Sequence, residues 1–553
     1  MRLRAAYSVS GRLDVHLSLS HRDPLMYRTA AFAAVLVVAL NVVPAFAAEH
    51  EDSVKVETEI KKGDEKKDEI PPEKAVTTNH SVSVGGKSIA YKATAGTLII
   101  RDDKGKPDAS VFYVAYTADG ESGKRPVTFL YNGGPGSASI WLHMGSFGPV
   151  RVATESPEAT SPAPFHLVPN DDSLLDKTDL VFVDAIGTGF SKGLPKAKDE
   201  NGKPDKDDEN PNKRFWGTDQ DIDAFGRFII RYITVNKRWN SPKFLFGESY
   251  GTPRSAGLAR YLEEHGVALN GVVLLSSIIN YASRLPGLDN DYVNLLPTFA
   301  AIAWYHNKLP NKPATLEPFL TDVRNFARSD YAVALNKGQD LTPAERDAIA
   351  ERMSKYTGLS VAYLKEANLR VSQQRYRKEL MRDERRTLGR YDGRFEGIDE
   401  DAAGENPQSD PADTAIRGAF TGAFNDYLTR ELNYSSDVVY NVSANGANRE
   451  WDFKHTIRGS QRPVPLPIMG SDLGDAMRTN PHLKVLSANG YFDLATPFFA
   501  TEYDLGHMDI DPALRKNLSF TYYPSGHMVY LNLDALKQFK GDLAKFYDSA
   551  TGH

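Results

Sequence analysis

Short apolar runs recur along this chain, and several of them have the length of a strand. Val127 to Tyr131, Leu180 to Val183 and Gly271 to Leu275 are continuous runs of this kind. Comparable runs return near the C-terminus, at residues 483–487 and 520–523. Continuous apolar runs are typical of strands that are buried on both faces, as in a parallel sheet covered by helices. The pattern therefore predicts an α/β fold with a mostly parallel central sheet.

The segments before these runs have a different, alternating pattern. Apolar and polar residues alternate in Ser81 to Val84, Ile89 to Ala93, Thr97 to Ile100 and Ser110 to Thr117. Alternation with a period of two is typical of strands with one exposed face. We expect these segments to form a series of hairpins at the start of the folded part.

The middle of the chain changes character and becomes helix-rich. Thr342-Pro343-Ala344-Glu345 is a capping box with proline at the first helical position, and a further helix is predicted from Val361 towards Leu388. Core-type strands resume afterwards. We therefore predict a helical cap or lid at 286–464, inserted between two parts of one core, 79–285 and 465–553.

The N-terminal region has the features of an export signal. Met26-Tyr27-Arg28 is a short basic start, residues 30–43 are almost wholly apolar, and Ala45-Phe46-Ala47 has the A-x-A form of a cleavage site. The alternative is an uncleaved anchor, but the apolar run is short for a membrane span. We expect residues 1–47 to be removed, with Met26 a candidate initiator, and the mature protein to be periplasmic or secreted. Residues 48–78 are dense in charge and predict a solvated tether.

Composition excludes several kinds of chemistry. The 553 residues include no cysteine, so disulfides, thiolate metal sites and cysteine nucleophiles are excluded. A net charge of −6 gives no global attraction to nucleic acid. There is no H-E-x-x-H motif and no P-loop lysine, so we expect no metal and no cofactor. A basic cluster lies in the middle of the chain, and acidic residues are interspersed in it, which predicts a solvated helix face. Its members are Arg375, Arg377, Arg382, Arg385 and Arg386.

The strongest sign of chemistry is the pentapeptide Gly247-Glu248-Ser249-Tyr250-Gly251. It follows the apolar run at 243–246 and precedes a helical pattern at 255–264. Strand, G-x-S-x-G and helix together form the context of a nucleophile elbow, in which a strained turn exposes the serine hydroxyl. Ser249 is therefore the candidate nucleophile.

A serine nucleophile needs a base and a group that orients the base. His527 and Asp493 each follow a predicted strand, and the chain order Ser, Asp, His is that of α/β-hydrolases. The alternatives are a structural loop histidine and a capping aspartate. His507 and Asp504 are rival candidates in more helical surroundings.

An oxyanion hole needs two backbone N–H groups. Tyr250, which follows the nucleophile, supplies one. The glycine-rich loop at 132–136, after the run at 127–131, is the candidate source of the other. A plain glycine-rich turn is the alternative for that loop.

Five ordered motifs together resemble the serine carboxypeptidase family, over roughly residues 125 to 535 with the helical insertion unaligned. The motifs are Tyr131-Asn132-Gly133-Gly134-Pro135-Gly136-Ser137-Ala138-Ser139, Gly187-Thr188-Gly189-Phe190-Ser191, Gly247-Glu248-Ser249-Tyr250-Gly251, Gly490-Tyr491-Phe492-Asp493 and Gly526-His527-Met528. The resemblance implies an α/β-hydrolase fold with a cap, and release of C-terminal residues from peptide substrates through an acyl-enzyme.

The resemblance also implies roles for individual residues. Ser249 would be the nucleophile, His527 the base and Asp493 its orienting acid. Gly134 and Tyr250 would donate the oxyanion-hole hydrogen bonds. Three residues would help to hold the substrate and its terminal carboxylate: Asn132, Gly133 and Glu248.

The chain departs from the family pattern at several positions. The family's second carboxylate-binding acid is Ser146 here, a neutral residue that we place among the candidate substrate-binding positions. Without a second acid, we expect no like charge from that position to raise the pKa of Glu248, and we expect activity at higher pH than is usual in the family. His143, on the same predicted helix face as Ser146, is either a substitute donor or a packed helix residue. Where the family usually has a cysteine in the glycine-rich loop, this chain has Ser137. Where the family has an acid two residues before the catalytic aspartate, this chain has Tyr491.

Three readings of function follow from these patterns. The first is an exported serine carboxypeptidase. The second is an esterase, amidase or acyltransferase on the same scaffold, because the triad fixes acyl transfer but not the acyl acceptor. The third is a non-catalytic binding protein, which would not require Ser249, Asp493 and His527 to be intact.

Overall fold

A ten-stranded sheet forms the centre of the computed structural model, which describes residues 72–120, 123–196, 209–285 and 287–552. These residues belong to one compact unit, 67–553. The predicted signal peptide and most of the predicted tether lie outside the described residues. No helix of the described residues is both long enough and apolar enough to cross a membrane.

The sheet strands are, in chain order, β1 Ala75–Val84, β2 Lys87–Arg101, β3 Pro107–Ala118, β4 Val127–Tyr131, β7 Asp179–Val183, β8 Lys192–Gly193, β9 Lys243–Glu248, β10 Gly271–Leu275, β13 Lys484–Gly490 and β14 Leu518–Tyr523. Two further pairs lie outside the sheet: β5 Val150–Val152 with β6 Leu167–Pro169, and β11 Arg386–Leu388 with β12 Glu396–Ile398. The apolar runs predicted as strands all form strands. The two alternating runs at 89–93 and 97–100 merge into the single strand β2.

The order of strands identifies the fold. It runs β1-β2-β3-β7-β4-β9-β10-β13-β14, with β8 beside β3. Strand β3 is antiparallel to β2 and β7, whereas every neighbouring pair from β7 to β14 is parallel. A mostly parallel sheet with an early antiparallel strand, and a serine turn after a central strand, is the α/β-hydrolase fold. The predicted fold class is confirmed.

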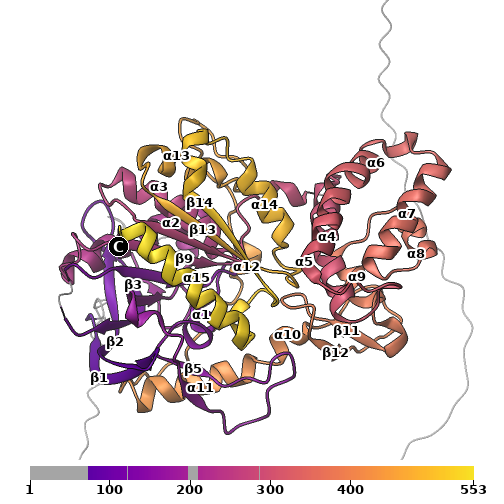
Figure 1. Cartoon of the computed structure of the whole chain (residues 1–553). Coiled ribbons are helices and arrows are strands. Elements are labelled where there is room, and N and C mark those ends of the chain that lie inside the picture. Colours follow the sequence, from indigo (N-terminus) through magenta and orange to yellow (C-terminus); the bar gives the residue numbers. More distant parts are fainter. Residues whose placement is uncertain (1–71, 121–122, 197–208, 286, 553) are drawn as a thin grey trace, which may run out of the picture. The chain divides into compact units, whose positions relative to one another are not determined.

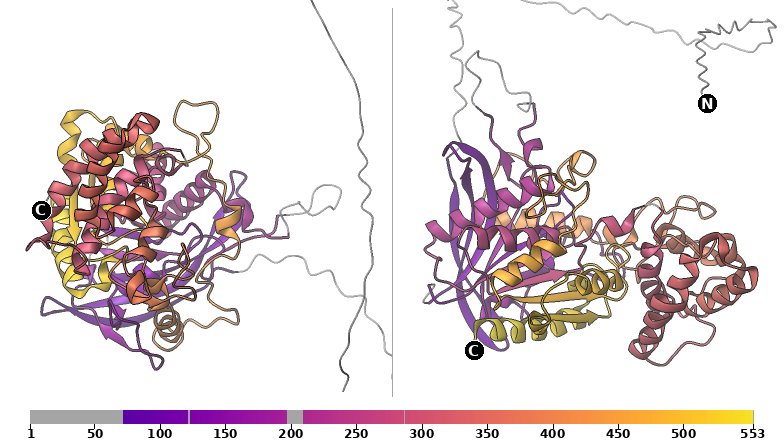
Figure 2. Two further views of the ribbon diagram at one scale, coloured as in Figure 1. Left: turned by 90° about the vertical axis from the view of Figure 1, so that its right-hand side faces the viewer. Right: turned by 90° about the horizontal axis from the view of Figure 1, so that it is seen from above.

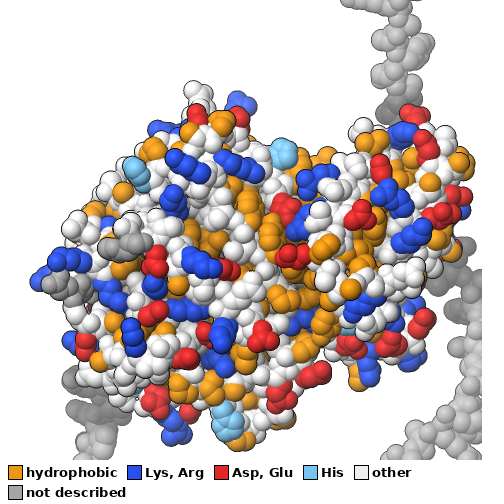
Figure 3. Space-filling model, in the orientation of Figure 1, with side chains coloured by type: hydrophobic (Ala, Val, Ile, Leu, Met, Phe, Trp, Pro, Cys, Tyr) orange, Lys and Arg blue, Asp and Glu red, His pale blue; other side chains and the backbone are white. Residues whose placement is uncertain are grey.

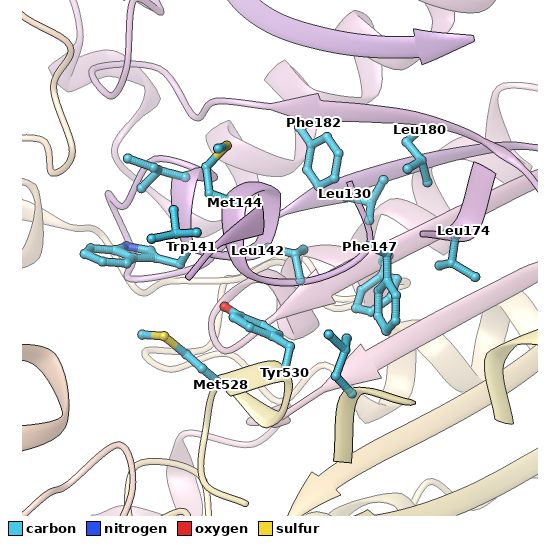
Figure 4. Close-up of a cluster of buried hydrophobic side chains, with 14 of the residues drawn as sticks. Leu130, Trp141, Leu142, Met144, Phe147, Leu174, Leu180, Phe182, Met528 and Tyr530 are labelled. Carbon is cyan, nitrogen blue, oxygen red and sulfur yellow. The ribbon is translucent and has the colours of Figure 1, made fainter. Parts of the chain in front are cut away.

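Helices cover both faces of this sheet (Figures 1 and 2). On one face, α2 Thr218–Val235, α3 Gly251–Glu264 and α13 Gly470–Thr479 share a hydrophobic core with the strands. On the other face lie α1 Ile140–Gly145, α11 Arg417–Arg430 and α15 Leu533–Thr551. Figure 4 shows this second core, in which Trp141 and Leu142 of α1 face Met528 and Tyr530. This packing brings the C-terminal segment against the loop that follows β4.

The remaining helices lie in or beside the insertion: α4 Asn290–Tyr305, α5 Leu316–Phe326, α6 Ala332–Asn336, α7 Pro343–Thr357, α8 Val361–Glu366, α9 Gln373–Glu379, α10 Pro411–Thr414, α12 Ala447–Glu450 and α14 Phe498–Gly506. Helices α4 to α9 build a hydrophobic core of their own, which also takes in Tyr491, Phe492 and Leu494. The predicted capping box is present, since Thr342 accepts from the Glu345 N–H and Glu345 accepts from the Thr342 N–H.

The structure differs from the sequence-based expectations at four places. Strand β1 begins at Ala75, inside the predicted tether. The single helix predicted from Val361 to Leu388 is wrong, because α8, α9 and β11 divide that stretch. Helix α11, assigned to the insertion, packs its apolar face on the main sheet. Arg377 is not solvated but buried, and it donates hydrogen bonds to the carbonyls of Leu388 and Ser409.

Candidate active site

Ser249 occupies a strained turn between β9 and α3. Its φ is +59°, in the left-handed region that non-glycine residues rarely adopt. A side chain on Gly247 would place its Cβ 2.0 Å from the Gly251 carbonyl oxygen, so only glycine permits this turn. The Ser249 N–H donates to the Leu275 carbonyl at 3.0 Å, and the Ser249 carbonyl accepts from the Thr252 N–H at 2.8 Å. These contacts present a half-exposed hydroxyl above the sheet, as the sequence pattern predicts.

The glycine-rich loop after β4 lies directly against this elbow. A Cβ on Gly133 would come within 2.2 Å of the Tyr250 amide nitrogen, so the loop approaches at backbone distance only because Gly133 has no side chain. In the described part of the chain, the N–H groups of Gly134 and Tyr250 have no hydrogen-bond acceptor. Two free N–H groups next to a candidate nucleophile have the character of an oxyanion hole.

A buried arginine holds the glycine-rich loop in place. Arg254 on α3 donates to the Asn132 carbonyl at 2.8 Å and forms an ion pair with Asp221 at 2.7 Å. Its guanidinium also lies 4.2 Å from the centre of the Phe225 ring. The position of the loop is therefore fixed before any substrate binds.

His527 and Asp493 form a buried hydrogen-bonded pair. His527 Nδ1 lies 2.7 Å from Asp493 Oδ2, so Nδ1 carries the proton and Nε2 is free to accept one. Burial alone would lower the pKa of His527, but the Asp493 charge and hydrogen bond, with a contribution from Glu248, outweigh burial and raise it. The structure therefore brings together the candidate base and the candidate acid.

The Asp493 carboxylate has a full set of donors. Its Oδ1 accepts from the N–H groups of Ala495 at 2.8 Å and Thr496 at 2.9 Å. Its Oδ2 accepts from the Thr496 hydroxyl at 2.5 Å as well as from His527. Thr496 was not predicted from the sequence, although a threonine three residues after an aspartate is a recognisable turn pattern.

A segment of the insertion, residues 389–394, connects the acid loop to the base loop; we call it the cap segment. The Leu494 N–H donates to the Arg390 carbonyl at 3.0 Å, and the His527 N–H donates to the Tyr391 carbonyl at 2.6 Å. Asp392 accepts from the Gly526 N–H at 3.1 Å and pairs with Arg394 at 2.6 Å. The insertion therefore helps to position both residues, a role that the sequence did not reveal.

Glu248 lies buried beside the same site. Tyr530 donates to its Oε2 at 2.9 Å, and Asn132 is a further hydrogen-bond partner. Burial raises the pKa of Glu248 to about 7, against the lowering effects of the His527 charge and the Tyr530 hydrogen bond. We expected no like charge from position 146 to raise this pKa, and burial is the main cause of the rise instead.

The structure does not bring Ser146 into this site. Its side chain is fully buried, and its hydroxyl donates back to the Leu142 carbonyl within α1. His143 is a packed helix residue rather than a substitute donor. It stacks on Phe182 with ring centres 4.2 Å apart and makes a 2.6 Å hydrogen bond with the Tyr116 hydroxyl, and burial lowers its pKa to about 3.

The predicted residues meet at one cavity of about 350 Å³. Of the residues predicted from the sequence, those that line it are Ser249, His527, Glu248, Asn132, Gly133 and Gly134. Asp493 lies behind His527 and Tyr250 beneath the elbow, both buried. The rivals lie elsewhere: His507 contacts Tyr503 on α14, and Asp504, on the same helix, has a pKa that burial raises to about 7. No group of three or more side chains suited to a metal ion occurs within the described residues.

Part of the chain matches a known family of peptidases. A sequence model described as serine carboxypeptidase matches residues 87–287. This stretch includes Ser249 and the glycine-rich loop, whereas Asp493 and His527 lie beyond it. This match supports the resemblance to serine carboxypeptidases for the nucleophile elbow and the glycine-rich loop.

Comparison with individual proteins finds a carboxypeptidase that matches only a short stretch, and solved structures with low sequence identity. The pheromone-processing carboxypeptidase KEX1 of Saccharomyces cerevisiae is 31% identical over 155 residues, which cover 27% of this chain and 19% of that protein. The match thus spans about a fifth of the relative's length. Among solved structures, a carboxyl esterase from Bacillus coagulans is 13% identical with a TM-score of 0.34, covering 82% of this chain and 98% of the esterase. A proline iminopeptidase from Mycobacterium smegmatis is 14% identical with a TM-score of 0.31, covering 86% and 99% respectively.

Proposed function

We propose that this chain is a serine-type carboxypeptidase, which hydrolyses C-terminal peptide bonds through an acyl-enzyme. The observation that carries the proposal is the convergence at one cavity of a strained serine and a histidine that is hydrogen-bonded to a buried aspartate. The family match over residues 87–287 supports the peptidase class. The substrate is then a peptide, and the reaction needs no cofactor.

The proposed reaction begins at the Ser249 hydroxyl. Its oxygen attacks the carbonyl carbon of the scissile bond while His527 Nε2 takes the proton. Asp493 stabilises the resulting imidazolium through Nδ1, which it already holds at 2.7 Å. The free N–H groups of Gly134 and Tyr250 stabilise the negative oxygen of the tetrahedral intermediate.

Collapse of that intermediate completes acylation. The bond to the amine breaks, and His527 donates its proton to the leaving amine, which leaves Ser249 as an ester. Water then attacks the ester with His527 again acting as base, and the acid product departs. Each step uses groups that line the cavity or lie directly behind it.

The preference for a C-terminal residue rests on Glu248 and Asn132. A carboxyl group with a pKa of about 7 is largely protonated in mildly acidic solution, so it can donate a hydrogen bond to a substrate carboxylate. Asn132 lines the same cavity and offers an uncharged partner. These two residues favour a free carboxylate over an amide.

A fluorophosphonate probe followed by peptide mapping tests the proposed nucleophile. We expect modification at Ser249 alone, and none in a Ser249→Ala variant that keeps its fold. Removal of the nucleophile should lower kcat by about a million-fold. Turnover should then be compared for a blocked dipeptide and its C-terminal amide. Cleavage of both at equal rates would favour the broader esterase or amidase reading, and absence of labelling would favour a binding protein.

We also propose that the mature protein is exported, as the N-terminal pattern predicts. Residues 1–47 lie outside the described residues, so this part of the proposal rests on the sequence alone.

A further inference from the structure

Two arginines in the cavity form no ion pair with any of the described residues. Arg284 ends a short 3₁₀ helix, Ala282–Arg284, and Arg390 lies in the cap segment next to β11 and β12 (Figure 1). Both are half-buried and line the cavity that contains Ser249 and His527. Among the described residues, neither guanidinium has a carboxylate within ion-pair distance, and neither donates a hydrogen bond. Two unpaired cations therefore face the candidate catalytic centre.

The other charges of the cavity do not neutralise them. Arg417 also lines the cavity, but its Nε donates to Asp413 at 3.0 Å. The charges of Arg417 and Asp413 therefore balance each other. The remaining acid is Glu248, which its environment keeps largely uncharged below about pH 7. Burial lowers the pKa of Arg284. The charge of Asp291, the next largest influence, opposes this change, and the charge of Arg390 adds to it. The two guanidinium groups thus interact unfavourably with each other, a cost that an anion would relieve.

The backbone holds both arginines in place, and neither guanidinium donates a hydrogen bond within the described residues. The Arg390 carbonyl accepts from the Leu494 N–H at 3.0 Å, and the Arg390 N–H donates to Asp410 at 3.0 Å. The Arg284 N–H donates to the Tyr281 carbonyl at 3.3 Å, and the Tyr281 ring packs on Phe453 with centres 5.3 Å apart. The Arg390 guanidinium also lies 5.5 Å from the centre of the Tyr391 ring, a contact that leaves its N–H groups available. Fixed backbones with guanidinium N–H groups that donate no hydrogen bond are suited to binding an anion with little reorganisation.

The face of the molecule that Figure 3 draws carries charged side chains of both signs. Figure 3 shows Lys and Arg side chains interspersed with Asp and Glu over the visible face. Surface arginines are commonly paired, as Arg430 is with Asp426 at 2.6 Å. The two arginines at the cavity, which form no ion pair among the described residues, differ from this mixed arrangement.

We propose that Arg284 and Arg390 form an anion subsite that binds a carboxylate of the peptide substrate beside Ser249. The planar guanidinium matches a carboxylate in paired hydrogen bonds, which explains why arginine rather than lysine occupies both positions. The carboxylate has two sources, the C-terminus of the peptide or the side chain of an Asp or Glu next to the scissile bond. This subsite is additional to Asn132 and Glu248, and its role in turnover rests on the proposed function.

The test uses four blocked dipeptides, with Glu or Gln before a C-terminal leucine, each as free acid and as amide. The enzymes are the wild type, Arg284→Gln, Arg390→Gln, the double variant and the two Arg→Lys variants. The control is Arg430→Gln, which removes an exposed, paired arginine on α11. Hydrogen bonds to charged groups predict a loss of about tenfold to a hundredfold in kcat/KM for the substrate that carries the recognised carboxylate.

The pattern of losses identifies the source of the carboxylate. A loss confined to the Glu peptides, whether acid or amide, supports recognition of an acidic side chain. A loss confined to the free acids supports recognition of the terminus. The lysine variants should keep part of the preference, and Arg430→Gln should keep all of it. Unchanged ratios among the four substrates in the double variant would overturn the proposal.

A second measurement separates this proposal from the proposed function. Calorimetric titration of the Ser249→Ala protein with the Glu–Leu free acid needs no turnover. Binding that weakens about tenfold or more in the double variant supports the subsite even if the wild type hydrolyses none of the peptides. Equal binding by both proteins overturns it. Neither arginine donates a hydrogen bond through its side chain within the described residues, so the double variant should keep the Tm of the wild type. A clear fall in Tm would show that the arginines stabilise the fold, and would overturn the proposal.

Discussion

Asp493→Asn is the substitution that discriminates most sharply among the proposed roles. Oδ1 of Asp493 accepts two backbone N–H bonds, from Ala495 and Thr496. An asparagine must keep its carbonyl oxygen there, because its NH₂ group cannot accept those bonds. The NH₂ group therefore takes the place of Oδ2 and faces His527 Nδ1.

This orientation forces the wrong tautomer of the histidine. A donor at that place requires Nδ1 to accept, so the ring proton moves to Nε2, which can then no longer take the proton of Ser249. Thr496 can rotate its hydroxyl to accept from the new NH₂ group, so the fold should be preserved. A tautomeric block of this kind lowers kcat by about ten-thousandfold, or about 5.5 kcal/mol of transition-state stabilisation.

The assay is kcat/KM for a blocked dipeptide, together with the rate of fluorophosphonate labelling at Ser249. The matched control is Asp504→Asn, on α14, whose side chain does not line the cavity. Its carboxyl group is buried with a pKa of about 7, and one of its oxygens has no partner in the described part of the chain. Neutralising it should leave kcat/KM nearly unchanged. If Asp493→Asn kept kcat/KM within about tenfold of wild type while Asp504→Asn lost it, the assignment of the acid would be wrong.

Three further predictions concern pH and processing. The ratio of free-acid to amide cleavage should fall as pH rises through about 7, where Glu248 loses its proton, and a Glu248→Gln variant should show no such fall. His455 pairs with Asp219 and Asp472, and although burial opposes it, these contacts raise its pKa to about 9. The contribution of His455 to the free energy of unfolding is therefore complete below its unfolded pKa of about 6.5, and it is lost as pH rises through about 9. The difference in free energy of unfolding between wild type and His455→Gln should shrink by about 2 kcal/mol over that range, and a constant difference would contradict the pairing. N-terminal sequencing of exported protein should begin at Ala48; a membrane-bound protein with Met26 or Met1 intact would contradict the predicted cleavage.

The sequence by itself determined the class of fold and indicated the candidate site residues. Continuous apolar runs mark β4, β7, β10, β13 and β14 because a parallel sheet is buried on both faces. Ser249 could be found because an elbow between a strand and a helix requires small residues at fixed spacing. His527 and Asp493 could be paired because the carboxyl ends of parallel strands lie at the same edge of a sheet.

Only the tertiary structure decided what surrounds those residues. Ser146 has the sequence position of a substrate-binding residue, but its hydroxyl donates to the Leu142 carbonyl within α1. Spacing along the chain does not predict this hydrogen bond. The pKa of Glu248 depends on burial, which depends on every element packed around it. Arg284 and the cap segment lie far from Ser249 in the sequence, and no local pattern predicts that they reach its cavity. Local propensity and periodicity determine the elements, whereas the charge balance and shape of a cavity arise from contacts between residues that are distant along the chain.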